Sequence, residues 1–271
     1  MTTKQQIRSS KKLRNIKKQR GKYPLLLEKI INISDIILEI LDARFPKEMQ
    51  NKEIEKLIKN KDKKIIYVLN KSDLTRKRDK RLNPRVFISC KHKKGITELR
   101  NKIKEEAIKV KKRGEYNRVQ VGVIGYPNTG KSSLINLLIG KASAKTGSEA
   151  GFTKGIQKLK LTKEIILLDS PGVIPIDKYS MTSKEKIAQH VKVGGRSYNQ
   201  VKDPEFVLNE IVKNNRKELE KFYNIKFKNA EDLIEKIGKK KGFLKKGDKI
   251  DSDRTARAIL KDWQLGNIKI Q

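Results

Sequence analysis

The sequence of 271 residues has little cysteine, few acidic residues and no long apolar run, and each shortage excludes a class of protein. The single cysteine, Cys90, excludes an internal disulfide and a zinc cluster built on cysteines. No apolar run approaches the length of a membrane span, and the polar N-terminus lacks the apolar core of a secretory signal. These shortages predict a cytoplasmic protein without a membrane partner.

Basic residues outnumber acidic residues by 66 to 31, which gives a formal net charge of +35. Solubility does not require such an excess, so we expect a polyanionic partner, nucleic acid before membrane. Residues 1–22 contain no acidic residue, and we interpret them as a basic arm that lies along phosphates; a solvated tail is the alternative. The basic loop at 75–81 leaves RNA contact and simple exposure equally open.

The most specific chemistry lies in VGVIGYPNTGKSS at 121–133, which fits the phosphate-binding pattern G-x-x-x-x-G-K-[ST] between an apolar strand and a helix. The glycines let the backbone turn its N–H groups toward a polyphosphate, and the helix N-terminus adds positive potential. Lys131 would reach the β- and γ-phosphates, and the Ser132 hydroxyl would ligate Mg²⁺. An ordinary Gly-rich turn is the alternative. The predicted nucleotide-binding residues of this loop are Asn128, Thr129, Gly130, Lys131, Ser132 and Ser133.

A second pattern, Asn70-Lys71-Ser72-Asp73, follows the apolar strand KIIYVL and predicts recognition of guanine. The Asp73 carboxylate can accept two hydrogen bonds from N1–H and the 2-amino group of guanine, which adenine does not offer there. We expect Asn70 to tie this loop to the phosphate-binding loop. The aliphatic stem of Lys71 should cover one face of the base.

A third pattern, Ser89-Cys90-Lys91, follows the strand expected at 85–89 and resembles the S-A-K element of GTPases. The middle residue of that element offers its backbone N–H to guanine O6, and a small buried Cys90 can replace alanine there. A reactive thiol is the alternative, which we disfavour because the sequence supplies no activating base. His92 should face solvent near the base.

Two further elements predict the response to the γ-phosphate. Asp169-Ser170-Pro171-Gly172 follows an apolar strand and fits D-x-x-G, in which Asp169 would hold Mg²⁺ through water and the Gly172 N–H would bond the γ-phosphate. Thr153 lies in the Gly- and Ser-rich connection 141–155 and is the natural candidate for the switch threonine that ligates Mg²⁺. The predicted catalytic residues are Lys131, Thr153 and Gly172.

These elements occur in the order N-K-x-D, S-C-K, phosphate-binding loop, Thr153 and D-x-x-G, a cyclic permutation of the usual order in GTPases. The chain therefore resembles the circularly permuted ribosome-assembly GTPases of the YlqF/YawG type over about residues 20–271. It shares with them the Asp42-Ala43-Arg44 motif and the G-x-P-N-x-G-K-S form of the loop. The resemblance implies GTP hydrolysis with Mg²⁺, coupled to large-subunit assembly through ribosomal RNA or a large-subunit precursor. We expect a monomer.

Val173 stands where Ras-like enzymes carry the glutamine that orients the attacking water. We therefore expect slow hydrolysis until a loop, a cation or the ribosomal partner supplies the missing group. Asn128 matches the asparagine that binds K⁺ in some relatives, so K⁺ is a further cofactor hypothesis. Residues 1–30 contain no histidine, and no catalytic histidine is carried over. A nucleotide-gated RNA-binding protein with negligible turnover, or a tRNA- or translation-linked GTPase, are the alternatives.

The fold class expected is α/β, a P-loop GTPase domain of circularly permuted motif order with a C-terminal all-α domain. The predicted units are a basic arm at 1–22, the GTPase domain at 23–176 and a basic helical RNA-binding domain at 177–271. Single helices are expected at 49–61 and 95–112, the latter buried through Ile96, Leu99, Ile103 and Ile108.

In the C-terminal part the sequence predicts helices at 183–193, from an Asp203 cap to 223, from an Asn229 cap to 237 and from a Ser252 cap to Gly266. His190 is expected on a helix surface and Trp263 in the core. The basic loop 239–249 could face RNA, with a solvated helical cap as the alternative. The predicted helical core comprises Leu208, Ile211, Leu219, Phe222, Leu233, Ile234, Ile237, Ile259, Leu260 and Trp263.

Overall fold

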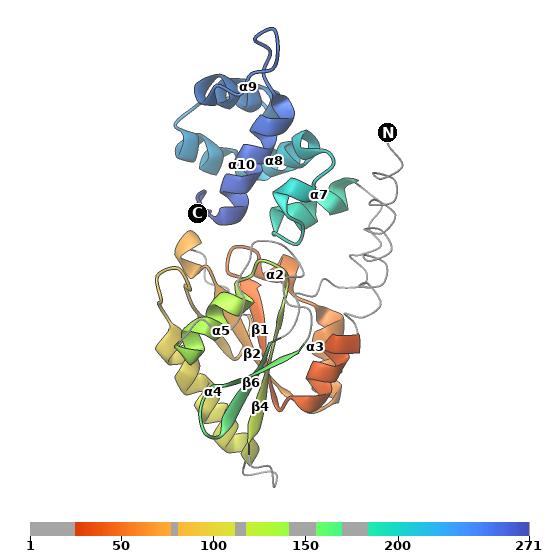
Figure 1. The fold of residues 1–271 in the computed structure, drawn as a ribbon, viewed down its shortest axis with the longest axis vertical. Helices are drawn as coiled ribbons and strands as arrows, with labels where there is room; N and C mark the ends of the chain where they lie inside the picture. The colour runs from red at the N-terminus through yellow and green to blue at the C-terminus, as the bar shows by residue number, and fades with distance from the viewer. Residues whose placement is uncertain (1–24, 77–80, 112–117, 141–155, 170–183, 271) are drawn as a thin grey trace, which may run out of the picture.

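A computed structural model describes residues 25–76, 81–111, 118–140, 156–169 and 184–270. The basic arm, Thr153, Gly172, Val173 and the predicted domain boundary at 176 lie outside these residues, so the predictions made for them stay predictions. The described residues form a sheet flanked by helices and a separate group of helices beside one end of the sheet (Figure 1).

The sheet has six strands in the order β3-β2-β1-β4-β6-β5, and its neighbours pair in parallel except β5 with β6. The strand β1 is buried along its whole length, as a parallel strand covered on both faces requires. The last two strands form an antiparallel pair. The strands are β1 Ile36–Asp42, β2 Lys64–Asn70, β3 Arg85–Phe87, β4 Val119–Gly125, β5 Gln157–Lys160 and β6 Ile165–Asp169.

Helices cover both faces of the sheet (Figure 1). The helical residues 25–33 and α3 cover one face, and α4 and α5 cover the other. The helix expected at 49–61 is present at Lys52–Asn60, but its predicted start is wrong, because the chain turns at Gln50 and Asn51 caps the helix by accepting from the Ile54 N–H at 3.2 Å. The helices are α2 Pro46–Met49, α3 Lys52–Asn60, α4 Ile96–Lys111 and α5 Lys131–Ile139, with the short 3₁₀ turn η1 at Ser72–Leu74.

One residue of the predicted core of α4 is misplaced. Ile108 is 58% exposed, whereas Ala107 is buried. The buried stripe of this helix continues from Ile103 to Ala107, four positions later, as one face of an α-helix requires. The predicted burial of Ile108 is therefore wrong by one position.

The C-terminal group contains α7 Lys184–Lys192, the 3₁₀ turn η2 Tyr198–Gln200, α8 Pro204–Tyr223, α9 Ala230–Lys241 and α10 Ser252–Leu265. The predicted caps at Asp203 and Asn229 and the stop at Gly266 are confirmed. The predicted Ser252 cap is wrong, because Asp251 accepts from the Arg254 N–H at 3.1 Å. Trp263 is fully buried, as expected for a core residue.

The predicted core residue Phe222 is 40% exposed, and its neighbour Tyr223 is buried in its place. The buried stripe of α8 runs through Asn215, Leu219 and Tyr223 in steps of four residues, so it passes Phe222 by one position. The hydroxyl of Tyr223 donates to Asp262 at 2.9 Å and so keeps a hydrogen-bond partner.

The helical group and the part that contains the sheet share one apolar core, in which Phe45 lies 6.1 Å from Trp263 between ring centroids. The last described residues also return to the part that contains the sheet, where the Ile270 N–H donates to the Leu74 carbonyl at 3.0 Å. Among the residues that the structure describes, no helix is long and apolar enough to cross a membrane.

Candidate nucleotide-binding site

The predicted base-recognition and phosphate-binding loops leave the sheet at the same edge. The strands β2 and β4 both pair in parallel with β1, and the pairs Asp42–Asn70 and Ile40–Gly125 fix their register. The carboxyl ends of neighbouring parallel strands are where open α/β sheets bind ligands. The topology therefore brings together two loops that lie 52 or more residues apart in the sequence.

Asn70 joins these loops through three hydrogen bonds while it is only 2% exposed. Its amide nitrogen donates to the Thr129 carbonyl of the phosphate-binding loop at 2.7 Å, which is the contact expected from the sequence. Its amide oxygen accepts from the backbone N–H groups of Lys71 at 2.8 Å and of Cys90 at 3.1 Å. One side chain thus connects the N-K-x-D, S-C-K and phosphate-binding elements.

The glycine pattern of the phosphate-binding loop has a steric cause. Gly130 has φ +94°, and a Cβ there would collide with the Asn70 amide nitrogen. Gly125 has φ +148°, and a Cβ there would collide with the Ile40 carbonyl oxygen of the neighbouring strand. Both positions combine a backbone conformation that side chains disfavour with a close approach that excludes one.

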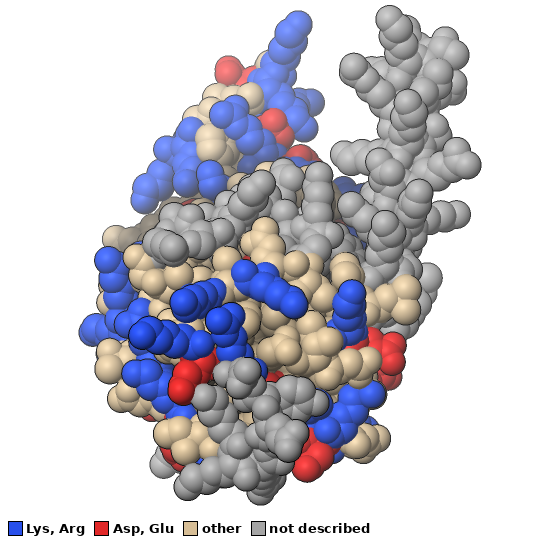
Figure 2. All heavy atoms as spheres, turned by 60° about the horizontal axis from the view of Figure 1, so that its bottom comes forward, with Lys and Arg blue, Asp and Glu red and all other residues tan. Residues whose placement is uncertain are grey.

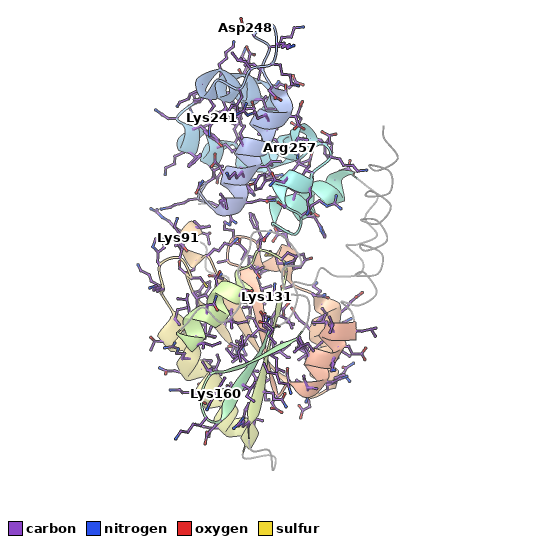
Figure 3. All side chains as sticks on the ribbon, in the orientation of Figure 1. Lys91, Lys131, Lys160, Lys241, Asp248 and Arg257 are labelled. Atoms are coloured by element: carbon purple, nitrogen blue, oxygen red, sulfur yellow. The ribbon has the colours of Figure 1, made fainter. Side chains whose placement is uncertain are left out.

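Lys131 lies inside this loop, at the end of the sheet that faces the helical group (Figure 3). Its ammonium donates to the carbonyls of Tyr126 at 2.6 Å and of Gly125 at 3.0 Å, and the side chain is buried. Burial lowers the pKa of Lys131 to about 8, although the carboxylate of Asp169 opposes the shift. A buried ammonium held by backbone carbonyls is suited to receive phosphate oxygens.

Asp169 and Ser132 supply the oxygens that a nucleotide-bound Mg²⁺ would need. Asp169 ends β6, pairs with Val123 of β4 and is fully buried; Ser132 lies in the first turn of α5. Mg²⁺ prefers hard oxygen ligands and usually takes one or two from the protein and others from phosphates and water. This donor set fits Mg²⁺. Thr153, the other predicted ligand, lies outside the described residues.

The residues predicted to read the base lie on the loops after β2 and β3. The Asp73 carboxylate lies 3.6 Å from the His92 imidazole, which is half exposed, as expected. Ser89 is buried and accepts from the His92 N–H at 3.2 Å, and Lys91 is exposed. Burial raises the pKa of the Cys90 thiol to about 11, which agrees with a structural role for this cysteine.

Two contacts between these loops and the helical group were missed by sequence reasoning. In the phosphate-binding loop, Asn128 has φ +59° and donates its amide to the Gly194 carbonyl at 3.1 Å, while Ser133 is exposed. His190 is buried with its ring edge-on to Tyr126, at 6.2 Å between centroids. The expectation of a surface position for His190 is therefore wrong, because α7 lies against the phosphate-binding loop.

Asp42 and Arg44 belong to a motif noted in the sequence, but their partners could not be read from the sequence. Arg44 binds the Asp42 carboxylate through two guanidinium nitrogens, at 3.0 and 2.8 Å, and the Lys71 ammonium binds it at 3.0 Å. The guanidinium also donates to the Trp263 carbonyl at 3.0 Å. This cluster connects the N-K-x-D loop to α10.

Comparisons with known proteins agree with this geometry. The family described as 50S ribosome-binding GTPase matches residues 120–237. An uncharacterized GTP-binding protein of Methanocaldococcus jannaschii is 39% identical over 255 residues, which cover 90% of this chain and 65% of that protein. Nucleolar GTP-binding protein 2 of Saccharomyces cerevisiae is 31% identical over 262 residues, which cover 89% of this chain and 51% of the relative. The chain thus spans between half and two thirds of the length of these relatives.

Two solved structures of YlqF share the fold. The GDP-bound form has a TM-score of 0.61 and 20% identity and covers 89% of this chain and 94% of its own. The GNP-bound form from T. maritima has a TM-score of 0.60 and 22% identity, with 93% and 95% covered. The motif order, the relatives and the shared fold lead to one conclusion. The chain shares the motif order and the fold of the circularly permuted GTPases of the YlqF type, and its sequence is similar to those of GTP-binding proteins of M. jannaschii and S. cerevisiae.

Proposed function

We propose that this chain binds GTP with Mg²⁺, hydrolyses it slowly alone, and acts in assembly of the large ribosomal subunit through ribosomal RNA. The hydrogen bond from Asn70 to the Thr129 carbonyl carries the nucleotide part of the proposal. It fixes the base-reading loop at a set position relative to the phosphate-binding loop, which recognition of one entire nucleotide requires.

In this proposal each residue keeps the role that its chemistry suggests. Asp73 accepts from the guanine edge, the Cys90 N–H donates to O6, and the Lys71 stem covers the base. Lys131 binds the β- and γ-phosphates, and Ser132 with Asp169 holds Mg²⁺. Thr153 and Gly172 would sense the γ-phosphate. Magnesium, when bound, would neutralise charge that develops on the phosphate oxygens.

The base-reading role of Asp73 has a direct test. In an Asp73→Asn variant the carboxylate becomes an amide that can donate a hydrogen bond. Xanthine carries a carbonyl where guanine carries the 2-amino group, so the variant should lose affinity for GDP and gain affinity for XDP. Titration of both nucleotides against both proteins measures the exchange. A variant that keeps the guanine preference of the parent would contradict the assignment.

The RNA-binding part rests on the charge of the surface. Lys and Arg side chains are spread over the face shown in Figure 2, on both parts of the molecule. A basic hairpin projects from the helical group, with Asp248 at its tip (Figure 3), and is closed by the bridge between Leu244 and Ile250. Arg254 lies 4.3 Å from the Phe243 ring and holds the base of this hairpin. Its exposed basic residues are Lys245, Lys246 and Lys249.

Steady-state GTP hydrolysis with and without purified large ribosomal subunits tests the coupling, with Asp73→Asn as control. Strong stimulation by the subunit that is lost in the control supports a ribosome-activated GTPase. The second candidate is a nucleotide-gated RNA-binding protein with negligible turnover, which Val173 favours because valine cannot orient a water. Tight GTP-dependent binding without stimulated hydrolysis would favour that candidate, and binding to tRNA instead of subunits would favour a translation-linked GTPase.

Potassium, the cytoplasmic location and a monomeric state remain predictions. For potassium, the amide nitrogen of Asn128 already donates to the Gly194 carbonyl, which fixes the side chain at the edge of the phosphate-binding loop. A K⁺ ion would bind the amide oxygen of the same group. Replacing K⁺ with Na⁺ without any loss of hydrolysis rate would contradict this hypothesis.

A further inference from the structure

We propose that Arg44 is a positioning residue that docks the guanine loop, residues 70–74, on the last turn of α10, so that the affinity for guanine nucleotides depends on the docking of the helical group. The inference rests on the proposed guanine site. It concerns a group that does not touch the nucleotide and acts through Lys71.

The first step is the ion pair beneath the guanine loop. Asp42 and Arg44 side chains are 1% and 2% exposed, and Lys71 reaches the same carboxylate from the loop at 3.0 Å. Burial alone would raise the pKa of Asp42, but the charges of Arg44 and Lys71 more than offset burial and hold that pKa well below its ordinary value. The carboxylate therefore remains charged and fixes the end of the Lys71 side chain.

The second step leads from Arg44 to the helical group. A guanidinium nitrogen that is not needed for Asp42 donates to the Trp263 carbonyl at 3.0 Å. Trp263 lies in the last turn of α10, where its carbonyl accepts from the Gly266 N–H at 3.2 Å and can accept a second hydrogen bond, and the helix dipole favours a cation there. Arg44 thus binds Asp42 and caps α10 at the same time, which a single lysine ammonium cannot reproduce.

A second contact between the same two regions supports this connection. The segment after α10 runs along the guanine loop, where Ile270 pairs with Thr75 and donates its N–H to the Leu74 carbonyl at 3.0 Å. A Cβ at Gly266 would collide with the Leu74 side chain, so the two segments are in close contact. Leu74 directly follows the base-reading residue Asp73. The helical group therefore holds the guanine loop at both of its ends.

The consequence for binding follows from preorganisation. The stem of Lys71 can cover the base only if the side chain points in one direction. The ion pair with Asp42 holds the side chain in that direction before the nucleotide binds, so binding costs no further side-chain entropy. Without Arg44, the Asp42 carboxylate would be held less firmly, and the Asp42–Lys71 ion pair would lose its connection to α10. We expect Arg44→Lys to weaken GDP binding by about tenfold, the effect of one charge-assisted hydrogen bond.

The chain offers a matched control in Arg257 (Figure 3), which binds Asp253 through two guanidinium nitrogens at 2.7 and 3.0 Å. It also donates to the carbonyls of Tyr198 and Val201, at 2.9 Å each, within the helical group. Arg257→Lys removes the same kinds of bond without a connection to the guanine loop. Arg257→Lys should change GDP affinity by less than about twofold, because neither Arg257 nor its partners belong to the proposed guanine site.

A double-mutant cycle tests whether Arg44 acts through Lys71. GDP affinity is measured for the wild type, Arg44→Lys, Lys71→Ala and the double variant. If the inference is right, Arg44→Lys has almost no further effect once Lys71 is alanine. Wild-type GDP affinity in Arg44→Lys, or the same tenfold loss in both backgrounds, would overturn it. A wild-type protein that does not bind GDP would instead refute the proposed function.

A measurement on the unaltered chain covers the case in which Arg44→Lys fails to fold. Coupling between two sites is reciprocal, so docking that favours guanine must itself be favoured by guanine. GDP should therefore slow hydrogen exchange of the Ile270 amide, which bonds the Leu74 carbonyl. Unchanged exchange of this amide at saturating GDP would overturn the inference without any substitution.

Discussion

Asn70→Ala should destabilise the protein and disconnect the two loops that are predicted to bind the nucleotide. The substitution removes three hydrogen bonds, to the Thr129 carbonyl and to the N–H groups of Lys71 and Cys90. A net value of about 1 kcal/mol for each bond gives a loss of about 3 kcal/mol in the free energy of unfolding. The side chain is only 2% exposed, so water cannot easily replace the lost partners.

Urea denaturation of the nucleotide-free protein measures this loss, and GDP titration measures the effect on binding. Asn214→Ala is the matched control, because the Asn214 amide donates to the Glu210 carbonyl at 3.2 Å from an exposed position. The control should change stability by at most about 0.5 kcal/mol. A loss below about 1 kcal/mol for Asn70→Ala would show that water or a neighbour compensates, and would refute the reasoning.

Three further predictions follow from buried groups. Lys131 has a pKa of about 8, and its charged ammonium is needed at the phosphates. GDP affinity should therefore be constant below pH 8. Above pH 8 it should fall by up to about tenfold for each pH unit, because the ammonium loses its proton. Titrations at pH 7, 8 and 9 measure this fall, and Lys131→Met should lack it. Trp263→Ala should cost about 3 to 5 kcal/mol in urea denaturation, because the ring is fully buried. Cys90, with its pKa raised to about 11 by burial, should react with iodoacetamide far more slowly at pH 7 than a free cysteine does. Equal rates would contradict that burial.

Much of the fold could be predicted because local patterns and tertiary structure agree in the sheet. Apolar runs such as KIIYVL at 64–69 became buried parallel strands, and the helices after Asp203 and Asn229 begin at the expected caps. The errors concern single positions at the start of a helix or along its buried face. The chain turns at Gln50, so the helix begins at Lys52, and the buried stripe of α8 passes from Leu219 to Tyr223 instead of Phe222.

The candidate site could be predicted to the extent that its groups belong to motifs. The Asn70 contact to the phosphate-binding loop was expected because Asn70 belongs to the N-K-x-D pattern, which occurs here together with a phosphate-binding pattern. The burial of His190 was missed, since a single histidine in an amphipathic helix carries no sign of what the helix faces. The return of Ile270 to the guanine loop was missed for the same reason, because a short apolar tail has no periodicity.

The contacts that connect the nucleotide loops to the helical group share one chemical feature that explains why the sequence hides them. Arg44 and Asn128 each donate a side-chain N–H to a backbone carbonyl, of Trp263 and Gly194. Every residue supplies a carbonyl, so the acceptor position requires no particular amino acid and leaves no pattern in the sequence. Only the donor is chemically specific, and a donor alone does not name its partner. Connections of this kind become visible only when the fold has brought the two segments together.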